Sequence, residues 1–245
     1  MNVLDLFSGI GGFSIGLERA GMRTVAFCET EPFCRAVLAK HWPGVPCYED
    51  VRTLTADRLA RDGISVDVIC GGFPCQDIST AGKGAGLAGE RSGLWKEYAR
   101  LIGEIRPAYA IVENVSALLH RGLAEILGDL ASLGYDAEWH CIRASCAGLP
   151  HSRDRLWIVV YPNGSRMEGL DFPKPLRINS EESCRRELAR AIDAAMPADD
   201  YARMRGDIDG VPAIMDRLKA LGNAVVPQIP EIIGKAVMSH ASRNA

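Results

Sequence analysis

Apolar residues in the first two-thirds of the chain alternate between short runs typical of buried strands and longer stretches with helical spacing. The runs expected to form strands are Asn2–Phe7, Arg23–Cys28, Val66–Cys70, Tyr109–Val112 and Leu156–Tyr161. Helical spacing occurs at Phe13–Ala20, Pro32–His41, Leu94–Ile105 and Leu123–Leu133. This alternation of strand and helix predicts an α/β fold with a doubly wound, mostly parallel sheet.

The pattern changes after Tyr161. Residues 162–212 contain several prolines and turn-forming residues, with one helix expected at Glu181–Ala195. From Ile214 to Met238 a helical pattern returns, interrupted by Gly222-Asn223 and by Pro227. We therefore expect residues 1–161 and 213–245 to form one domain, and residues 162–212 to form a small separate region.

Composition narrows the class of protein. The chain has 245 residues, 47% of them hydrophobic, which is typical of a globular protein. No run of about 18 apolar residues occurs and the N-terminus carries no basic segment, so neither a membrane span nor a signal peptide is expected. The eight cysteines include no Cys-x-x-Cys pair, which disfavours a zinc site, and their sparse spread along the chain favours a reducing compartment such as the cytoplasm.

A glycine-rich turn follows the first predicted strand. Ser8-Gly9-Ile10-Gly11-Gly12 stands between this strand and a helix, an arrangement in which backbone N–H groups can approach a ligand closely. Glu29 and Glu31 follow the second strand, where a carboxylate can accept hydrogen bonds from a ribose diol. These residues predict a site for a nucleoside-type cofactor, although a tight turn with surface acids has the same local pattern.

Gly71-Gly72-Phe73-Pro74-Cys75-Gln76 follows the third predicted strand. A cysteine at the end of a strand and beside the start of a helix is often reactive, whereas a lone buried cysteine is inert. Residues 79–93 contain five glycines, which is typical of a mobile lid over such a cysteine or of a plain flexible loop.

Charged residues flank the last two predicted strands. Glu113 follows the buried run Tyr109–Val112, a place suited to proton transfer or to an exposed strand end. Arg153 and Arg155 directly precede Leu156–Tyr161, and their spacing places both side chains on one face of an extended segment. Paired guanidinium groups suit phosphate or carbonyl oxygens, but such a pair is also common on solvated surfaces.

Taken together, these motifs resemble the DNA (cytosine-5) methyltransferase family. The resemblance rests on five motifs, which occur in the family's order: Asp-Leu-Phe-Ser-Gly-x-Gly-Gly at 5–12, Gly-Phe-Pro-Cys-Gln at 72–76, Glu-Asn-Val at 113–115, Arg-x-Arg at 153–155 and Gly-Asn-Ala-Val-Val-Pro-Gln at 222–228. The resemblance implies a Rossmann-like domain that binds S-adenosylmethionine and carries a small target-recognition insert. It also implies transfer of a methyl group to carbon 5 of a cytosine that is flipped out of duplex DNA.

The resemblance also implies roles for the catalytic residues. Cys75 would attack carbon 6 of the base, and Glu113 would bind the N3 and amino edge and supply a proton. Arg155 would hold the base carbonyl, with Arg153 beside it. Covalent addition at carbon 6 turns carbon 5 into an enamine carbon, which is a far better nucleophile toward a methyl group.

The cofactor pocket implied by the resemblance draws on several segments. Its residues are Phe7, Gly9, Ile10, Gly11, Gly12, Glu29, Asp50, Val51, Pro74, Leu94, Asn223 and Ala224. Among them, Glu29 would bind the ribose, and Asp50 with Val51 the adenine edge. The product would be S-adenosylhomocysteine.

The chain departs from the family pattern in three ways. Thr30 stands where the family often has a large apolar or aromatic residue against the adenine, and His151 stands where many members have Gln. The insert of about 50 residues is short. We expect a monomer that acts on double-stranded DNA as a stand-alone modification enzyme of a bacterium or phage, with a helper subunit for target recognition as the alternative.

Three other functions fit parts of the pattern. An RNA cytosine methyltransferase of the same fold tends to carry a Cys-Phe-Thr signature, which is absent here. A catalytically silent DNA-binding relative would usually lack one of Cys75, Glu113 and Arg155. An adenosine-cofactor domain acting on a small molecule would not need the glycine-rich lid or the Pro74-Cys75 pair.

Net charge depends on the segment. The whole chain carries 28 basic and 31 acidic residues, a net charge of −3 that disfavours binding to nucleic acid. Residues 140–190, however, hold 9 basic and 6 acidic residues, while residues 1–139 hold 13 and 18. DNA binding draws on local positive surface, so we expect the basic middle segment, which includes Arg143, to meet DNA and the acidic first half to hold the cofactor.

Overall fold

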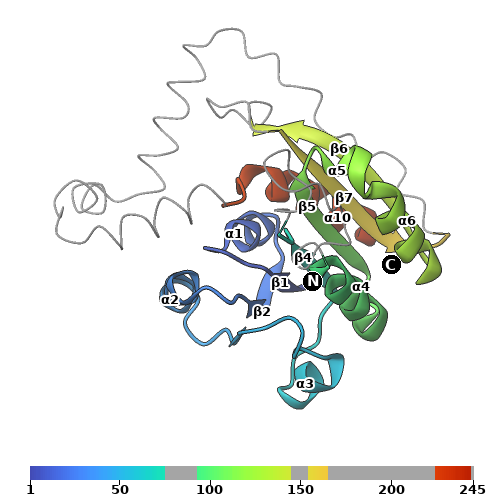
Figure 1. Ribbon diagram of the computed structural model, residues 1–245. Coiled ribbons are helices and arrows are strands. Elements are labelled where there is room, and N and C mark those ends of the chain that lie inside the picture. Colours follow the sequence, from blue (N-terminus) through green and yellow to red (C-terminus); the bar gives the residue numbers. More distant parts are fainter. Residues whose placement is uncertain (75–92, 145–153, 165–223, 244–245) are drawn as a thin grey trace, which may run out of the picture.

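The computed structural model describes residues 1–74, 93–144, 154–164 and 224–243, which build a central seven-stranded sheet with helices on both faces (Figure 1). The strands are β1 (Asn2–Leu6), β2 (Arg23–Cys28), β3 (Cys47–Tyr48), β4 (Val68–Gly71), β5 (Tyr109–Val115), β6 (Tyr135–Arg143) and β7 (Asp154–Pro162). The helices are α1 (Gly12–Arg19), α2 (Pro32–His41), α3 (Ala56–Arg61), α4 (Leu94–Ile105), α5 (Leu118–Arg121), α6 (Leu123–Ser132) and α10 (Gln228–Arg243).

The strand order is β3-β2-β1-β4-β5-β7-β6. Strands β1 to β5 are parallel, and β7 lies antiparallel between β5 and β6. The order of the parallel strands reverses between β1 and β4, because the chain winds outward from β1 to β3 and then returns to β4. This topology confirms the predicted α/β fold with its doubly wound, mostly parallel sheet.

Side chains along the strands alternate between two apolar cores. In β7, for example, Ile158 packs into one core and Trp157 and Val159 pack into the other. The first core contains buried residues of α3, α4 and α6, and the second contains those of α1 and α10. Helices therefore cover both faces of the sheet, so its central strands read as continuous apolar runs.

Some elements differ from those expected. Strand β6 was not predicted, because it forms the edge of the sheet and exposes Trp139, His140 and Cys141 instead of forming an apolar run. Strand β5 continues through Glu113 to Val115, and β7 begins at Asp154 rather than Leu156. The helix expected at Glu181–Ala195 and the first part of the pattern at Ile214–Met238 lie outside the described residues.

The C-terminal segment packs against α1 without intervening side chains. A Cβ on Gly12 would collide with the carbonyl oxygen of Val225, and one on Gly16 with that of Pro227. Gly234 of α10 packs against side chains at the end of α1, where a Cβ would be 2.8 Å from Cβ of Ala20. The end of the chain thus returns to the helix that follows the glycine-rich turn.

Among the described residues, no helix combines the length and the apolar character that crossing a bilayer requires.

We predict that Gly16→Ala lowers the free energy of unfolding by about 1–3 kcal/mol, because the added methyl group must displace the Pro227 backbone. The control is Gly128→Ala in α6, where a Cβ has no neighbour within 4 Å. This exchange should be neutral or should stabilise by up to about 1 kcal/mol, because alanine favours the helix. Urea denaturation of both variants is the measurement, and equal effects would show that the α1–α10 contact is loose.

Candidate active site

The turn after β1 and the loop after β4 leave the sheet side by side. Leu6 and Gly71 are paired at the carboxyl ends of these strands, and a Cβ on Gly71 would collide with the carbonyl oxygen of Leu6. This is also the point where the strand order reverses, the usual place for a ligand in an open α/β sheet. The glycine-rich turn and the segment that leads to Cys75 therefore start from the same place.

The glycine-rich turn has a backbone suited to holding a ligand. Phe7, Gly9 and Gly11 have φ values of 53°, 54° and 87°, and the Gly11 N–H donates to the carbonyl oxygen of Ser8 at 2.9 Å. Gly11 is the residue before α1, and as a glycine it provides no side-chain cap for this helix. Its first N–H groups can thus receive a carboxylate or another anionic group of a cofactor.

Glu29 joins this turn to the end of β2. Its Oε2 accepts from the Gly9 N–H and its Oε1 from the Glu31 N–H, both at 2.7 Å. Each carboxylate oxygen has a second lone pair, so Glu29 can still bind a ribose diol. The neighbouring Thr30 is exposed, in keeping with a pocket that lacks a large side chain at this position.

Asp50 and Val51 follow β3 at the same carboxyl edge of the sheet. Asp50 Oδ2 lies 3.0 Å from Arg52 Nη2. Hydrogen bonds from the Arg52 side chain and backbone hold the pKa of Asp50 below its usual value. An ionised Asp50 is an acceptor suited to an exocyclic amino group. Val51 is buried in the core, which anchors the turn.

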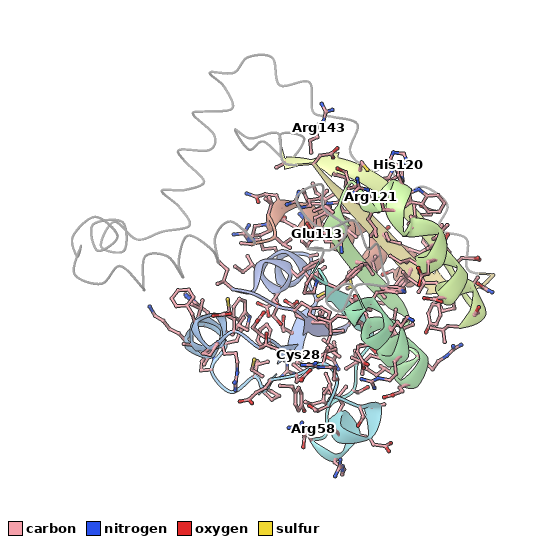
Figure 2. The ribbon with its side chains drawn as sticks, in the orientation of Figure 1. Cys28, Arg58, Glu113, His120, Arg121 and Arg143 are labelled. Atoms are coloured by element: carbon pink, nitrogen blue, oxygen red, sulfur yellow. The ribbon has the colours of Figure 1, made fainter. Side chains whose placement is uncertain are left out.

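Glu113 and Arg155 form an ion pair between the adjacent strands β5 and β7, with Arg155 Nε 2.9 Å from Glu113 Oε1. The Glu113 residue is 9% exposed, and a Cβ on Gly72 would stand 2.7 Å from its other oxygen. The carboxylate therefore lies against the segment that leads to Cys75, at the carboxyl end of β5 (Figure 2).

Asn114 was part of a motif but had no expected role. Its Nδ2 donates to the carbonyl oxygen of Phe73 at 3.0 Å, and its Oδ1 accepts from the Val115 N–H at 2.9 Å. These bonds fasten the Gly72–Pro74 segment to the end of β5. Only the tertiary structure reveals this role, because Asn114 and Phe73 are far apart in sequence.

Four aromatic rings connect the two sides of the site. Phe7 stacks on Tyr98 with ring centroids 6.5 Å apart, Tyr98 lies 5.8 Å from Trp95, and Trp95 lies 5.7 Å from Phe73. Trp95 and Tyr98 belong to α4 and are fully buried. Helix α4 therefore supports both the glycine-rich turn and the loop after β4.

The expected site residues fall into two groups. Those in the described part of the chain lie around the carboxyl edge of the sheet: Phe7, Gly9, Ile10, Gly11, Gly12, Glu29, Asp50, Val51, Pro74, Leu94, Glu113, Arg155 and Ala224. Cys75, Arg153, Asn223 and His151, and the glycine-rich stretch from 79 to 92, lie outside the described residues.

Four other cysteines in the described residues are poor candidates for a nucleophile. Burial raises the pKa of Cys28 to about 12, and it also raises the pKa of Cys47, Cys70 and Cys141. A thiol whose pKa is raised in this way is inert at neutral pH. In the part of the chain that the structure describes, no group of three or more His, Cys, Asp or Glu side chains could hold a metal ion.

Asp5 is a buried acid beneath the glycine-rich turn. Its Oδ2 accepts from Ser14 Oγ at 2.7 Å, which ties the end of β1 to the first turn of α1. Burial raises the pKa of Asp5 to about 7, so its carboxyl group is partly protonated at neutral pH. In the sequence, Asp5 stands out only as the first position of a motif, because its burial depends on both flanking strands.

The described fold is that of a Rossmann-like methyltransferase domain. The family model of C-5 cytosine-specific DNA methylases matches residues 1–203. The chain therefore belongs to the C-5 cytosine-specific DNA methylase family.

Individual relatives agree with this assignment. Type II methyltransferase M2.BsuMI of Bacillus subtilis is 38% identical over 65% of this chain and 42% of that protein. Type II methyltransferase M.AquIA of Picosynechococcus is 29% identical over 78% of this chain and 80% of that protein. A crystal structure of a DNA modification methyltransferase encoded within an E. coli prophage has a TM-score of 0.60 and 26% identity, covering 70% of this chain and 49% of that one. The chain thus spans about half the length of most of these relatives.

We predict that stability falls between pH 4 and pH 7 because of Asp5. Its pKa is about 7 in the folded protein and about 3.9 in an unfolded chain. Between these values the folded state binds more protons, so the free energy of unfolding decreases as pH rises toward and through the folded-state pKa. Asp5→Asn removes this difference in proton binding, so the difference in free energy of unfolding between pH 5 and pH 7.5 should shrink.

Urea denaturation at both pH values measures this difference, with Asp136→Asn at an exposed position of β6 as the control. The control should follow the wild type, and Asp5→Asn should not. Parallel behaviour of all three proteins would contradict the assignment.

Proposed function

We propose that this chain transfers a methyl group from S-adenosylmethionine to carbon 5 of cytosine in double-stranded DNA, through a covalent adduct of the flipped-out base with Cys75. The observation that carries the proposal is the Glu113–Arg155 pair, which lies against Gly72 only three residues before Cys75. A carboxyl group and a guanidinium at the approach to a cysteine match the needs of covalent catalysis on a pyrimidine.

The residues of the pocket fit S-adenosylmethionine, which supplies the activated methyl group. The uncapped start of α1 suits its carboxylate, Glu29 suits its ribose, and Asp50 with Val51 suits its adenine edge. Leu94 at the start of α4 and Ala224 before α10 complete the pocket from the other side of the site.

In the proposed reaction, the Cys75 thiolate adds to carbon 6 of the base, which moves electron density toward N3 and carbon 5. Glu113 acts here in its protonated form: one carboxyl oxygen donates a hydrogen bond to N3 and so stabilises the developing charge, while the other can still accept from Arg155. Arg155 holds the base carbonyl, and its guanidinium has five N–H donors, of which only some are used by Glu113 and the Asp154 carbonyl oxygen. Carbon 5 takes the methyl group, which leaves S-adenosylhomocysteine. Carbon 5 then gives up its proton to solvent, and the electron pair of that C–H bond re-forms the carbon 5–carbon 6 double bond and expels the Cys75 thiolate, which releases the product.

The proposal also assigns functions to parts of the chain. Residues 1–161 with 213–245 form the catalytic and cofactor-binding domain, and residues 162–212 form the target-recognition region. The described residues support the first assignment, because β1 to β7 form one sheet and α10 packs in the core on one of its faces. The chain acts as a monomer, and a helper subunit that completes target recognition is the alternative.

We predict a covalent protein–DNA complex on duplex DNA that contains 5-fluorocytosine, because fluorine at carbon 5 blocks the final proton loss. The DNA should be a pool of varied sequence, incubated with labelled S-adenosylmethionine and resolved on a denaturing gel. Cys75→Ala should form no complex and should lose methyl transfer by more than about a thousandfold. Glu113→Gln should also slow adduct formation, since its side chain cannot supply a proton.

Two results decide between the alternatives. A protein that binds S-adenosylmethionine but forms neither adduct nor methylated DNA alone, and does both after addition of a host extract, would favour the helper subunit. Absence of both products in either case would contradict the proposed function.

We also predict that Arg143 contributes to DNA affinity. This exposed residue ends β6 beside Asp154 and lies at the same end of the sheet as Glu113 (Figure 2). Arg143→Ala should weaken binding severalfold and reduce the slope of log K against log salt by about 1. Arg23→Ala is the control, because Arg23 is exposed at the opposite, amino end of β2. Fluorescence anisotropy at several salt concentrations measures both, and equal slopes would contradict the prediction.

A further inference from the structure

The turn that follows β3 is held by an arginine of α4. Arg100 Nη2 donates to the carbonyl oxygens of Val51 at 2.9 Å and of Leu54 at 3.0 Å. These two carbonyl groups belong to the turn that contains Asp50 and Val51. The bond therefore connects two segments that lie 46 and 49 residues apart in sequence.

The orientation of this guanidinium is itself constrained. Arg100 Nε donates to Glu97 Oε2 at 2.8 Å and its Nη1 to Glu104 Oε1 at 2.6 Å. The second oxygen of Glu104 accepts from the Ala56 N–H at the start of α3, at 3.1 Å. With its side chain 31% exposed, Arg100 is a partly buried charge whose partners fix the plane of its donors.

The bond to Val51 also reaches Asp50 through one peptide group. The Val51 carbonyl and the Arg52 N–H belong to the same peptide plane, and this N–H donates to Asp50 Oδ1 at 2.9 Å. Arg100 thus holds one end of the peptide while the Asp50 carboxylate holds the other. Because hydrogen bonds in such a chain polarise one another, loss of Arg100 should both free the peptide and loosen the carboxylate.

We propose that Arg100 is a positioning residue for cofactor selectivity: it orients the Asp50 carboxylate so that the pocket favours the 6-amino group of adenine. This inference rests on the proposed function, which places the adenine edge at Asp50 and Val51. Arg100 does not touch the reacting atoms, and its effect passes through the turn. Neither the family match nor the sequence motifs assign it a role.

The geometry requires arginine at this position. A lysine ammonium has three donors on one nitrogen, so it cannot reach two carbonyl groups and two carboxylates from fixed directions. Arg100→Lys should therefore restore only part of the selectivity that a neutral variant loses.

The test compares S-adenosylhomocysteine with S-inosylhomocysteine, which carries a 6-oxo group in place of the 6-amino group. Calorimetric binding to the full chain gives the ratio of the two dissociation constants. The wild type should prefer the amino compound by at least about tenfold, since a 6-oxo group facing a carboxylate leaves two acceptors opposed. Arg100→Gln should lower this ratio by about tenfold, and Arg100→Lys should give an intermediate value.

Arg106→Gln is the matched control. Arg106 follows α4, donates to the carbonyl oxygen of Leu133 and lies over the Tyr135 ring at 5.0 Å, away from the pocket. It should keep the wild-type ratio even if its stability falls. In turnover assays Arg100→Gln should raise KM for S-adenosylmethionine while leaving kcat and the KM for DNA within about twofold of the wild type.

The outcomes separate the two proposals. A wild type that binds neither compound would contradict the proposed function. A wild type that prefers the amino compound, with an unchanged ratio in Arg100→Gln, would overturn the role of Arg100. If Arg100→Gln does not fold, Arg100→Lys decides, because a wild-type ratio in this variant would equally overturn it.

Discussion

The backbones of β1 and β4 approach so closely that no side chain fits between Gly71 and the Leu6 carbonyl group. This contact sits where the order of the parallel strands reverses, and everything else in the site is arranged around it. The glycine-rich turn leaves from one strand and the segment leading to Cys75 leaves from the other. In the proposed function, a cofactor held by the first turn would lie next to a base bound beside the segment leading to Cys75, and methyl transfer needs that proximity.

Hydrogen bonds from side chains to backbone groups then hold these irregular segments in place. Glu29 holds the glycine-rich turn, Asn114 holds the segment before Cys75, and Arg100 holds the turn after β3. In each case a regular strand or helix, or its end, carries the side chain, and the loop provides only its backbone. Such an arrangement positions a site accurately because the rigid element does not move with the loop.

The antiparallel strand β7 has a separate role. Because it lies beside β5, it places Arg155 next to Glu113 at the carboxyl edge, although the chain forms the edge strand β6 before it returns to β7. In the proposed function, the first strands of the fold would hold the cofactor, and the strands beyond β4 would supply the groups that act on the base. The acidic charge of the first half and the basic charge of residues 140–190 match this division.

Much of the fold follows from local patterns, and the rest depends on long-range contacts. The predicted bounds of β2, α2 and α4 agree with the structure, because each combines a clear apolar period with a glycine or proline boundary. The motifs and their order likewise indicated the family, and through this resemblance they predicted Glu29, Glu113 and Arg155 as site residues. The sequence did not reveal β6, whose exposed edge has no apolar run, nor the strand extensions that carry Glu113 and Arg155. Only the tertiary structure decided the pairing of Glu113 with Arg155 and the contacts of Asn114 and Arg100, because each joins residues that are distant in sequence and meet only when the sheet and its covering helices are assembled.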